Sequence, residues 1–147
     1  MRMICILLLI GSLLPAQQQS PDPFASILAE PNPEKRYAKA LDLAVAEVNA
    51  ARKKYENGSL EDFRSSLILV EKSVRFADET LRGTGKNPAK SPKHFKRAEQ
   101  KIRDIMRKLS GLEDAVSVDD RTPVRKTYDA LEKLQEEIVM DIVGRRR

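Results

Sequence analysis

The chain has 147 residues, 33% of them charged, and its formal net charge is +5 at pH 7. This length fits one domain, and the positive charge indicates an anionic partner without identifying it. With a single cysteine, Cys5, and a single histidine, His94, the chain cannot form an internal disulfide or a metal site built from paired histidines.

The first residues have the pattern of a secretory signal peptide. Arg2 supplies a positive start, Ile4–Leu14 is apolar, and Pro15–Ala16 offers a cleavage site. The apolar run is too short to span a bilayer as a helix, which takes about 20 residues. We therefore expect residues 1–16 to be removed and the protein to be exported, into a bacterial periplasm or out of the cell. An uncleaved membrane anchor is the alternative.

Residues 17–31 are rich in Gln, Pro and small side chains, a composition typical of a disordered tether. Within this tether Phe24, Ile27 and Leu28 could form a short apolar contact with the domain that follows. The folded domain itself is expected to span residues 32–144.

Two helices joined by a short turn are predicted next. Asn32 followed by Pro33 is typical of a helix start, and Asn57–Gly58 is typical of an end. Ser59 opens the second helix, which Gly83 or Gly85 ends. Because the turn is short, the two helices must form an antiparallel hairpin. Apolar residues at steps of three and four define their inward faces: Tyr37, Leu41, Ala44, Val48, Ala51 and Tyr55 in the first, and Leu60, Phe63, Leu67, Val70, Val74, Ala77 and Leu81 in the second.

Two more helices follow a basic gap. Ser91–Pro92 predicts the start of the third helix, in which Gly111 could introduce a bend, and Pro123 predicts the start of the fourth, which ends at Gly144. Their predicted inward residues keep the same spacing: Phe95, Ala98, Ile102, Ile105, Leu109, Leu112 and Val116, then Val124, Tyr128, Leu131, Leu134, Ile138 and Ile142.

Four amphipathic helices with short links and no strand pattern predict an all-α fold, an up-down-up-down antiparallel four-helix bundle. The alternative is a three-helix core, with the fourth helix docked loosely or used in a dimer.

The most basic stretch, residues 82–97, lies between the two predicted hairpins. The first turns of helices normally carry Asp or Glu, because the helix dipole is positive there, whereas the third helix starts with Lys93, His94, Lys96 and Arg97. In an up-down-up-down bundle this stretch and the basic tail, residues 145–147, meet at one end. We define these cations as the basic pole and predict that they bind an anion: Arg82, Lys86, Lys90, Lys93, His94, Lys96, Arg97, Arg145, Arg146 and Arg147.

The alternative is that these cations form only a solvated face. Glu30, Glu79 and Glu99 are candidates to neutralise them, and Arg125 and Lys126 break the same first-turn rule in the fourth helix.

Residue patterns typical of catalytic or metal-binding sites are scarce. The paired carboxylates, such as Asp119–Asp120 and Glu136–Glu137, are typical of helix surfaces, and no Glu-x-x-His motif of di-metal bundles is present. We therefore assign no catalytic, cofactor-binding or metal-binding residue and expect a protein that is not an enzyme.

The block from Thr84 to Glu99, TGKNPAKSPKHFKRAE, resembles a segment of small uncharacterised exported bacterial helical proteins. That resemblance implies no activity and transfers no functional residue, and the sequence departs from the segment at Ala89–Lys90.

The sequence thus predicts a non-enzymatic exported bundle that binds an anionic partner through the basic pole. Candidate partners are anionic lipid, an acidic polymer, or an acidic face of another envelope protein. Nucleic acid is disfavoured, because no aromatic residues are interleaved with the cations for base stacking. The rival hypothesis is a structural interaction module or homodimer without a ligand site.

Overall fold

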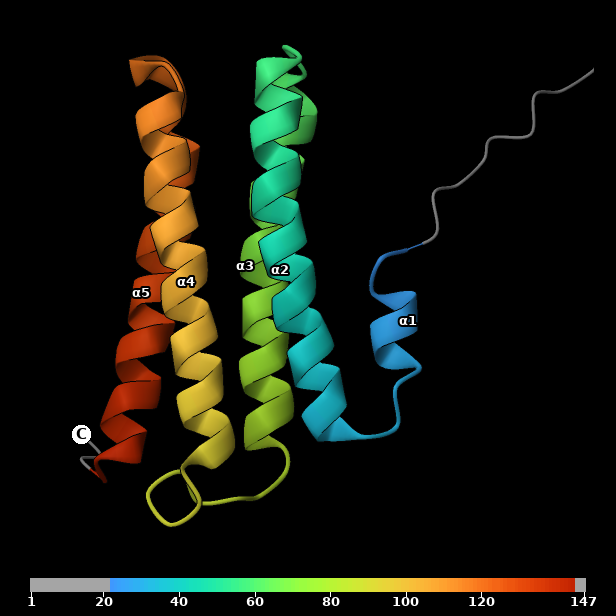
Figure 1. The fold of residues 1–147 in the computed structure, drawn as a ribbon, viewed down its shortest axis with the longest axis vertical. Helices are drawn as coiled ribbons and strands as arrows, with labels where there is room; N and C mark the ends of the chain where they lie inside the picture. The colour runs from blue at the N-terminus through green and yellow to red at the C-terminus, as the bar shows by residue number, and fades with distance from the viewer. Residues whose placement is uncertain (1–21, 145–147) are drawn as a thin grey trace, which may run out of the picture.

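The structure, a computed structural model, describes residues 22–144. Its long helices are α2 (Pro33–Glu56), α3 (Leu60–Arg82), α4 (Lys93–Ala115) and α5 (Arg121–Ile142), and its short ones are α1 (Ala25–Leu28) and the 3-10 turn η1 (Val118–Asp120). The long helices run alternately up and down (Figure 1). The predicted all-α, up-down-up-down four-helix bundle is therefore confirmed.

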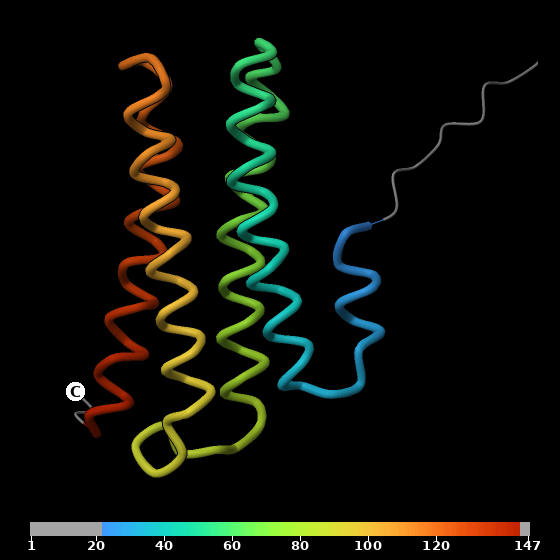
Figure 2. The backbone as a smooth tube through the Cα atoms, in the orientation of Figure 1, coloured from blue at the N-terminus to red at the C-terminus, as the bar shows by residue number. Residues whose placement is uncertain are grey.

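The bundle consists of two helical hairpins, α2–α3 and α4–α5. They meet along α2 against α4 and along α3 against α5, so the helices that face each other across the hairpins run parallel. The loop 83–92 therefore joins α3 to α4 across a diagonal of the bundle, and Figure 2 shows it spread over the lower end. This diagonal connection places the basic stretch over a wide part of one end.

Most predicted helix boundaries are confirmed, with two corrections. The side chain of Asn32 accepts a hydrogen bond from the Glu34 amide at 2.9 Å and so caps α2. The N-cap of α4, however, is Pro92, which has no capping side chain, so Ser91 lies one residue too early to cap it. Helix α5 begins at Arg121, two residues before Pro123, because proline is tolerated throughout a first turn whose N–H groups have no helical partner.

The core matches the predicted inward faces closely. Large side chains from all four long helices are fully buried, among them Phe63, Phe95, Ile102, Leu109, Leu131 and Ile138. The buried residues of α5 make the loosely docked fourth helix of the alternative wrong. Leu60 is the main exception to the prediction, at 39% exposed, because it occupies the first position of α3 at the end of the hairpin. Gly111 lies inside an unbroken α4.

The predicted tether, residues 17–31, is only partly described, and the described part differs from a disordered chain. Residues 22–31 contain α1, whose Ile27 is buried, and the preceding Phe24 is buried too. The ring of Phe24 packs edge-on against Phe76 of α3, with centroids 5.6 Å apart. Burial of two apolar side chains outweighs the polar composition here, whereas Leu28, the third residue of the expected contact, is 59% exposed.

Residues 1–21 and 145–147 lie outside the described part of the chain, so the predicted signal peptide stays a prediction. Among residues 22–144, no helix combines the length and the apolar character that a membrane crossing requires.

A polar cluster joins the two hairpins at the end opposite the loop 83–92. The hydroxyl of Tyr55 on α2 accepts a hydrogen bond from the Ser117 amide at 2.8 Å and donates one to Asp120 at 3.2 Å. Nearby, the guanidinium of Arg52 donates to the carbonyl oxygen of Gly111 at 2.9 Å. These bonds fix the hairpins relative to each other where no loop connects them.

Candidate functional site

The structure brings the described part of the basic pole together at the lower end of the bundle (Figure 1). Arg82 ends α3, the loop 83–92 follows, and Lys93 begins α4. The end of α5 closes against this loop, since a Cβ built on Gly144 would lie 3.9 Å from the Cβ of Ala89. Arg145, Arg146 and Arg147 lie outside the described residues, so their place in the pole stays a prediction.

Arg82 is the most strongly paired cation of the pole. Its Nε donates to Asp78 on the same helix at 2.8 Å, and its Nη1 reaches Asp141 of α5 at 2.5 Å. A hollow of about 820 Å³ opens beside this cluster, between the loop and the end of α5. Arg82 therefore holds the hairpins together, and its charge is already neutralised.

Glu34, in the first turn of α2, contacts two more members of the pole. It forms an ion pair with Lys86 of the loop, and Nε2 of His94 lies 3.2 Å from the same carboxylate oxygen. The hydrogen bond from Lys86 lowers the pKa of Glu34 below its ordinary value. The hydroxyl of Tyr37 lies 3.1 Å from Nδ1 of His94. Both contacts of His94 are satisfied when the Tyr37 hydroxyl donates to Nδ1 and the Nε2–H group donates to Glu34.

The carboxylates that neutralise the pole differ from those expected from the sequence. Glu30 pairs with Lys39 at 2.7 Å, and Glu99 accepts from Arg103 and from Gln135 of α5. Nearness in sequence is a poor guide here, because Glu34 and Asp141 reach the pole from helices that are distant along the chain.

The remaining described cations of the pole, Lys90, Lys93, Lys96 and Arg97, are exposed. Among residues 22–144 none of these four forms an ion pair. Two of them line a hollow of about 470 Å³ at the start of α4, together with Lys86, Ser91, Pro92 and His94. The first turn of α4 has no acidic residue and no side-chain cap. The pole thus divides into paired cations that support the fold and unpaired cations that face solvent.

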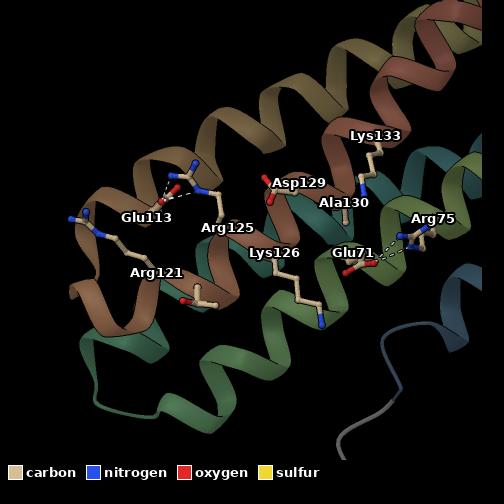
Figure 3. Close-up of a pocket in the computed structure, with 10 residues that line it drawn as sticks. Glu71, Arg75, Glu113, Arg121, Arg125, Lys126, Asp129, Ala130 and Lys133 are labelled. Atoms are coloured by element: carbon tan, nitrogen blue, oxygen red, sulfur yellow. Dashed lines mark hydrogen bonds and ion pairs between the residues drawn. The ribbon is translucent and has the colours of Figure 1, made fainter.

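Another hollow, of about 670 Å³, lies between α3 and α5 and is called here the α3–α5 groove (Figure 3). The lining is mostly charged, and its α5 side includes Arg121, Arg125, Lys126, Asp129 and Lys133. No pattern in the sequence predicts this groove. Its one signal is the pair of cations Arg125 and Lys126 near the start of the fourth helix. The contribution of α3 cannot be seen until the two hairpins are placed side by side.

Within residues 22–144, no three or more His, Cys, Asp or Glu side chains are grouped so that they could hold a metal ion. Comparison with protein-family models, with curated proteins and with solved structures finds no match to the chain. The candidate site therefore has to be interpreted from its own geometry.

Proposed function

We propose that this protein is an exported, non-enzymatic helical bundle that binds an anionic partner through the unpaired cations of its basic pole. One observation carries the proposal: in the described part of the chain, the hollow at the start of α4 is lined by Lys86, Lys93, His94 and Lys96 and by no carboxylate side chain. Exposed ammonium groups around backbone N–H groups favour an oxyanion.

The local electrostatics support this choice. Cations in the first turn of a helix oppose its dipole, each at a cost of about 0.3–1 kcal/mol that a bound anion would offset. The paired members Lys86 and His94 are held in place by Glu34, so the rim of the hollow is ordered before a ligand arrives. Anionic lipid headgroups, acidic polymers and an acidic protein face share the required chemistry.

Binding to anionic vesicles tests the proposal. We expect the protein to cosediment with phosphatidylglycerol vesicles at low salt, to be released as salt is raised, and to ignore neutral vesicles. The double variant Lys93→Glu/Lys96→Glu should lose this binding. Its matched control is Lys53→Glu/Lys108→Glu, which reverses two exposed lysines away from the pole and should bind as the parent does. Equal binding by both variants would contradict a role for the pole.

A homodimer is the second candidate, and one observation favours it. Val139, Met140 and Val143 form an exposed apolar strip at the C-terminal end of α5, at 37%, 41% and 62% exposure. A dimer through this strip predicts a mass that rises with protein concentration in sedimentation equilibrium and a monomeric Met140→Glu/Val143→Glu variant. A parent that stays monomeric at high concentration would rule this candidate out.

A further inference from the structure

The α3–α5 groove has a regular cationic wall. Lys126, Ala130 and Lys133 are spaced four and three residues apart, so they follow one stripe of α5, and Glu71 and Arg75 of α3 line the opposite side. Ala130 is the smallest side chain of the stripe, and it leaves the hollow open between the two lysines. Helix α5 begins at the end of the bundle opposite the loop 83–92 (Figure 1), and Lys126 lies in its second turn, so the groove is separate from the basic pole.

The carboxylates that line the groove neutralise only part of its positive charge. Glu71 pairs with Arg75 at 2.9 Å, and Glu113 of α4 accepts from Nε of Arg125 at 3.0 Å. Within the described residues Arg121, Lys126 and Lys133 have no ion-pair partner, and Asp129 is the one lining carboxylate left over. The groove therefore presents more unpaired cations than unpaired carboxylates.

A buried donor also lacks an acceptor at this groove. The Nε atom of Arg121 is buried and has no hydrogen-bond partner among residues 22–144. Buried polar groups without a partner are rare in native proteins, and each one indicates strain or a missing water or ligand. Arg121 lines the groove beside Thr122 and Arg125, so several hydrogen-bond donors gather at its upper end. Because the buried Nε atom itself is inaccessible, a ligand with several acceptor oxygens would accept from the other donors there.

We propose that the α3–α5 groove binds a linear polyanion that carries phosphate groups. Lys126 and Lys133 are seven residues apart along α5, which corresponds to about 10 Å, so a single phosphate contacts both only when both side chains bend toward it. A chain of phosphates can contact both lysines and also reach the donors at Arg121. Guanidinium groups favour this class further, because their planar fork matches two phosphate oxygens at once. The site is independent of the function proposed for the basic pole.

Inorganic polyphosphate is the probe, and binding is measured by fluorescence anisotropy of the labelled polymer against the full chain. We expect Lys126→Gln/Lys133→Gln to weaken binding about ten-fold and to make it less sensitive to salt, because two phosphate contacts are lost. Orthophosphate should bind far more weakly, since it carries less charge and makes fewer contacts along the groove than the polymer does. The matched control is Lys53→Gln/Lys108→Gln, which removes the same charge from two exposed lysines that line neither the groove nor the hollow of the pole and should keep parental affinity.

A third variant tests the open volume of the groove independently of its charge. Ala130→Leu fills the groove without changing any charge and should weaken polyphosphate binding several-fold, and the unfolding midpoint of each variant shows that it has folded. Equal losses in the groove variant and the control would show that net charge alone governs binding, and a loss confined to Lys93→Gln/Lys96→Gln would place the polymer at the basic pole. Either outcome overturns the groove, as would tight binding of polyglutamate or unchanged binding by Ala130→Leu.

Discussion

Arg82 and Asp78, one turn apart on α3, form an ion pair that leaves one carboxylate oxygen unsatisfied. The Arg82 guanidinium donates to Oδ2 of Asp78, while Oδ1 is buried and has no partner among the described residues. Burial raises the pKa of Asp78 above its ordinary value, although Arg82 opposes the rise, and Glu137 and Asp141 of α5 add to it. The ionised form of this group is therefore less favourable in the folded chain than in the unfolded one.

The pH dependence of stability follows from the direction of that shift. Because the folded-state pKa of Asp78 lies above the unfolded one, its contribution to stability is fully present below the unfolded pKa and is lost as pH rises through the folded pKa. Asp78→Asn removes this dependence and should be about 1 kcal/mol more stable than the parent at neutral pH, because the folded chain no longer bears the cost of burying this charge. Urea unfolding over a series of pH values measures both effects.

Asp104→Asn serves as the control for this substitution, since Asp104 is exposed and pairs only with Arg107. It should change stability by less than about 0.5 kcal/mol. A variant at Asp78 that is less stable than the parent at neutral pH would mean that the ion pair with Arg82 outweighs the cost of burial.

The sequence was sufficient to predict the four-helix fold, because the spacing of apolar residues along each helix shows which face is buried. Residues such as Phe63, Phe95 and Leu131 were placed in the core by spacing alone, and they are fully buried. The short helix α1 was missed, because its few apolar residues sit in a polar segment whose composition predicts disorder. The diagonal path of the loop 83–92 could not be predicted either, because spacing identifies the inward face of a helix but not its neighbour.

The candidate site was predictable only as a set of charges. The sequence located the cations of residues 82–97, yet it could not show that Glu34 and Asp141 would reach Lys86 and Arg82 from other helices. The α3–α5 groove was missed for the same reason, since its walls come from segments about fifty residues apart. Pairing between distant side chains depends on how the hairpins dock, which no local pattern encodes.

Phe95 fixes the start of α4 to the core, and its removal should be costly. The ring is 1% exposed, so Phe95→Ala should lower the free energy of unfolding by about 3–5 kcal/mol through lost burial and the cavity left behind. Urea unfolding measures the loss. Leu28→Ala, at a side chain that is 59% exposed, should stay within about 0.5 kcal/mol of the parent. A loss below about 1 kcal/mol at Phe95 would contradict its burial.

Tyr55 joins the hairpins through its hydroxyl, and Tyr55→Phe isolates that contribution. The substitution removes the hydrogen bonds to the Ser117 amide and to Asp120 and keeps the packing of the ring against Phe63. We expect a loss of about 1–2 kcal/mol, because one bond is to a charged group. Tyr128→Phe is the control, since its hydroxyl makes no hydrogen bond within residues 22–144. Equal effects in thermal unfolding would show that the bonds contribute nothing specific.

Two glycines should respond to alanine with opposite signs. Gly58 follows α2 with φ at +78°, a left-handed conformation that costs other residues about 1–2 kcal/mol, so Gly58→Ala should destabilise by that amount. Gly111 lies inside α4, where an added Cβ would meet only the Arg52 guanidinium at 3.8 Å. Gly111→Ala should therefore stabilise by about 0.5–1 kcal/mol, because alanine loses less backbone entropy in a helix. The hydrogen bond from Arg52 is kept, since its acceptor is the backbone carbonyl. Paired urea titrations measure both changes, and a destabilised Gly111→Ala would mean that the added methyl group displaces Arg52.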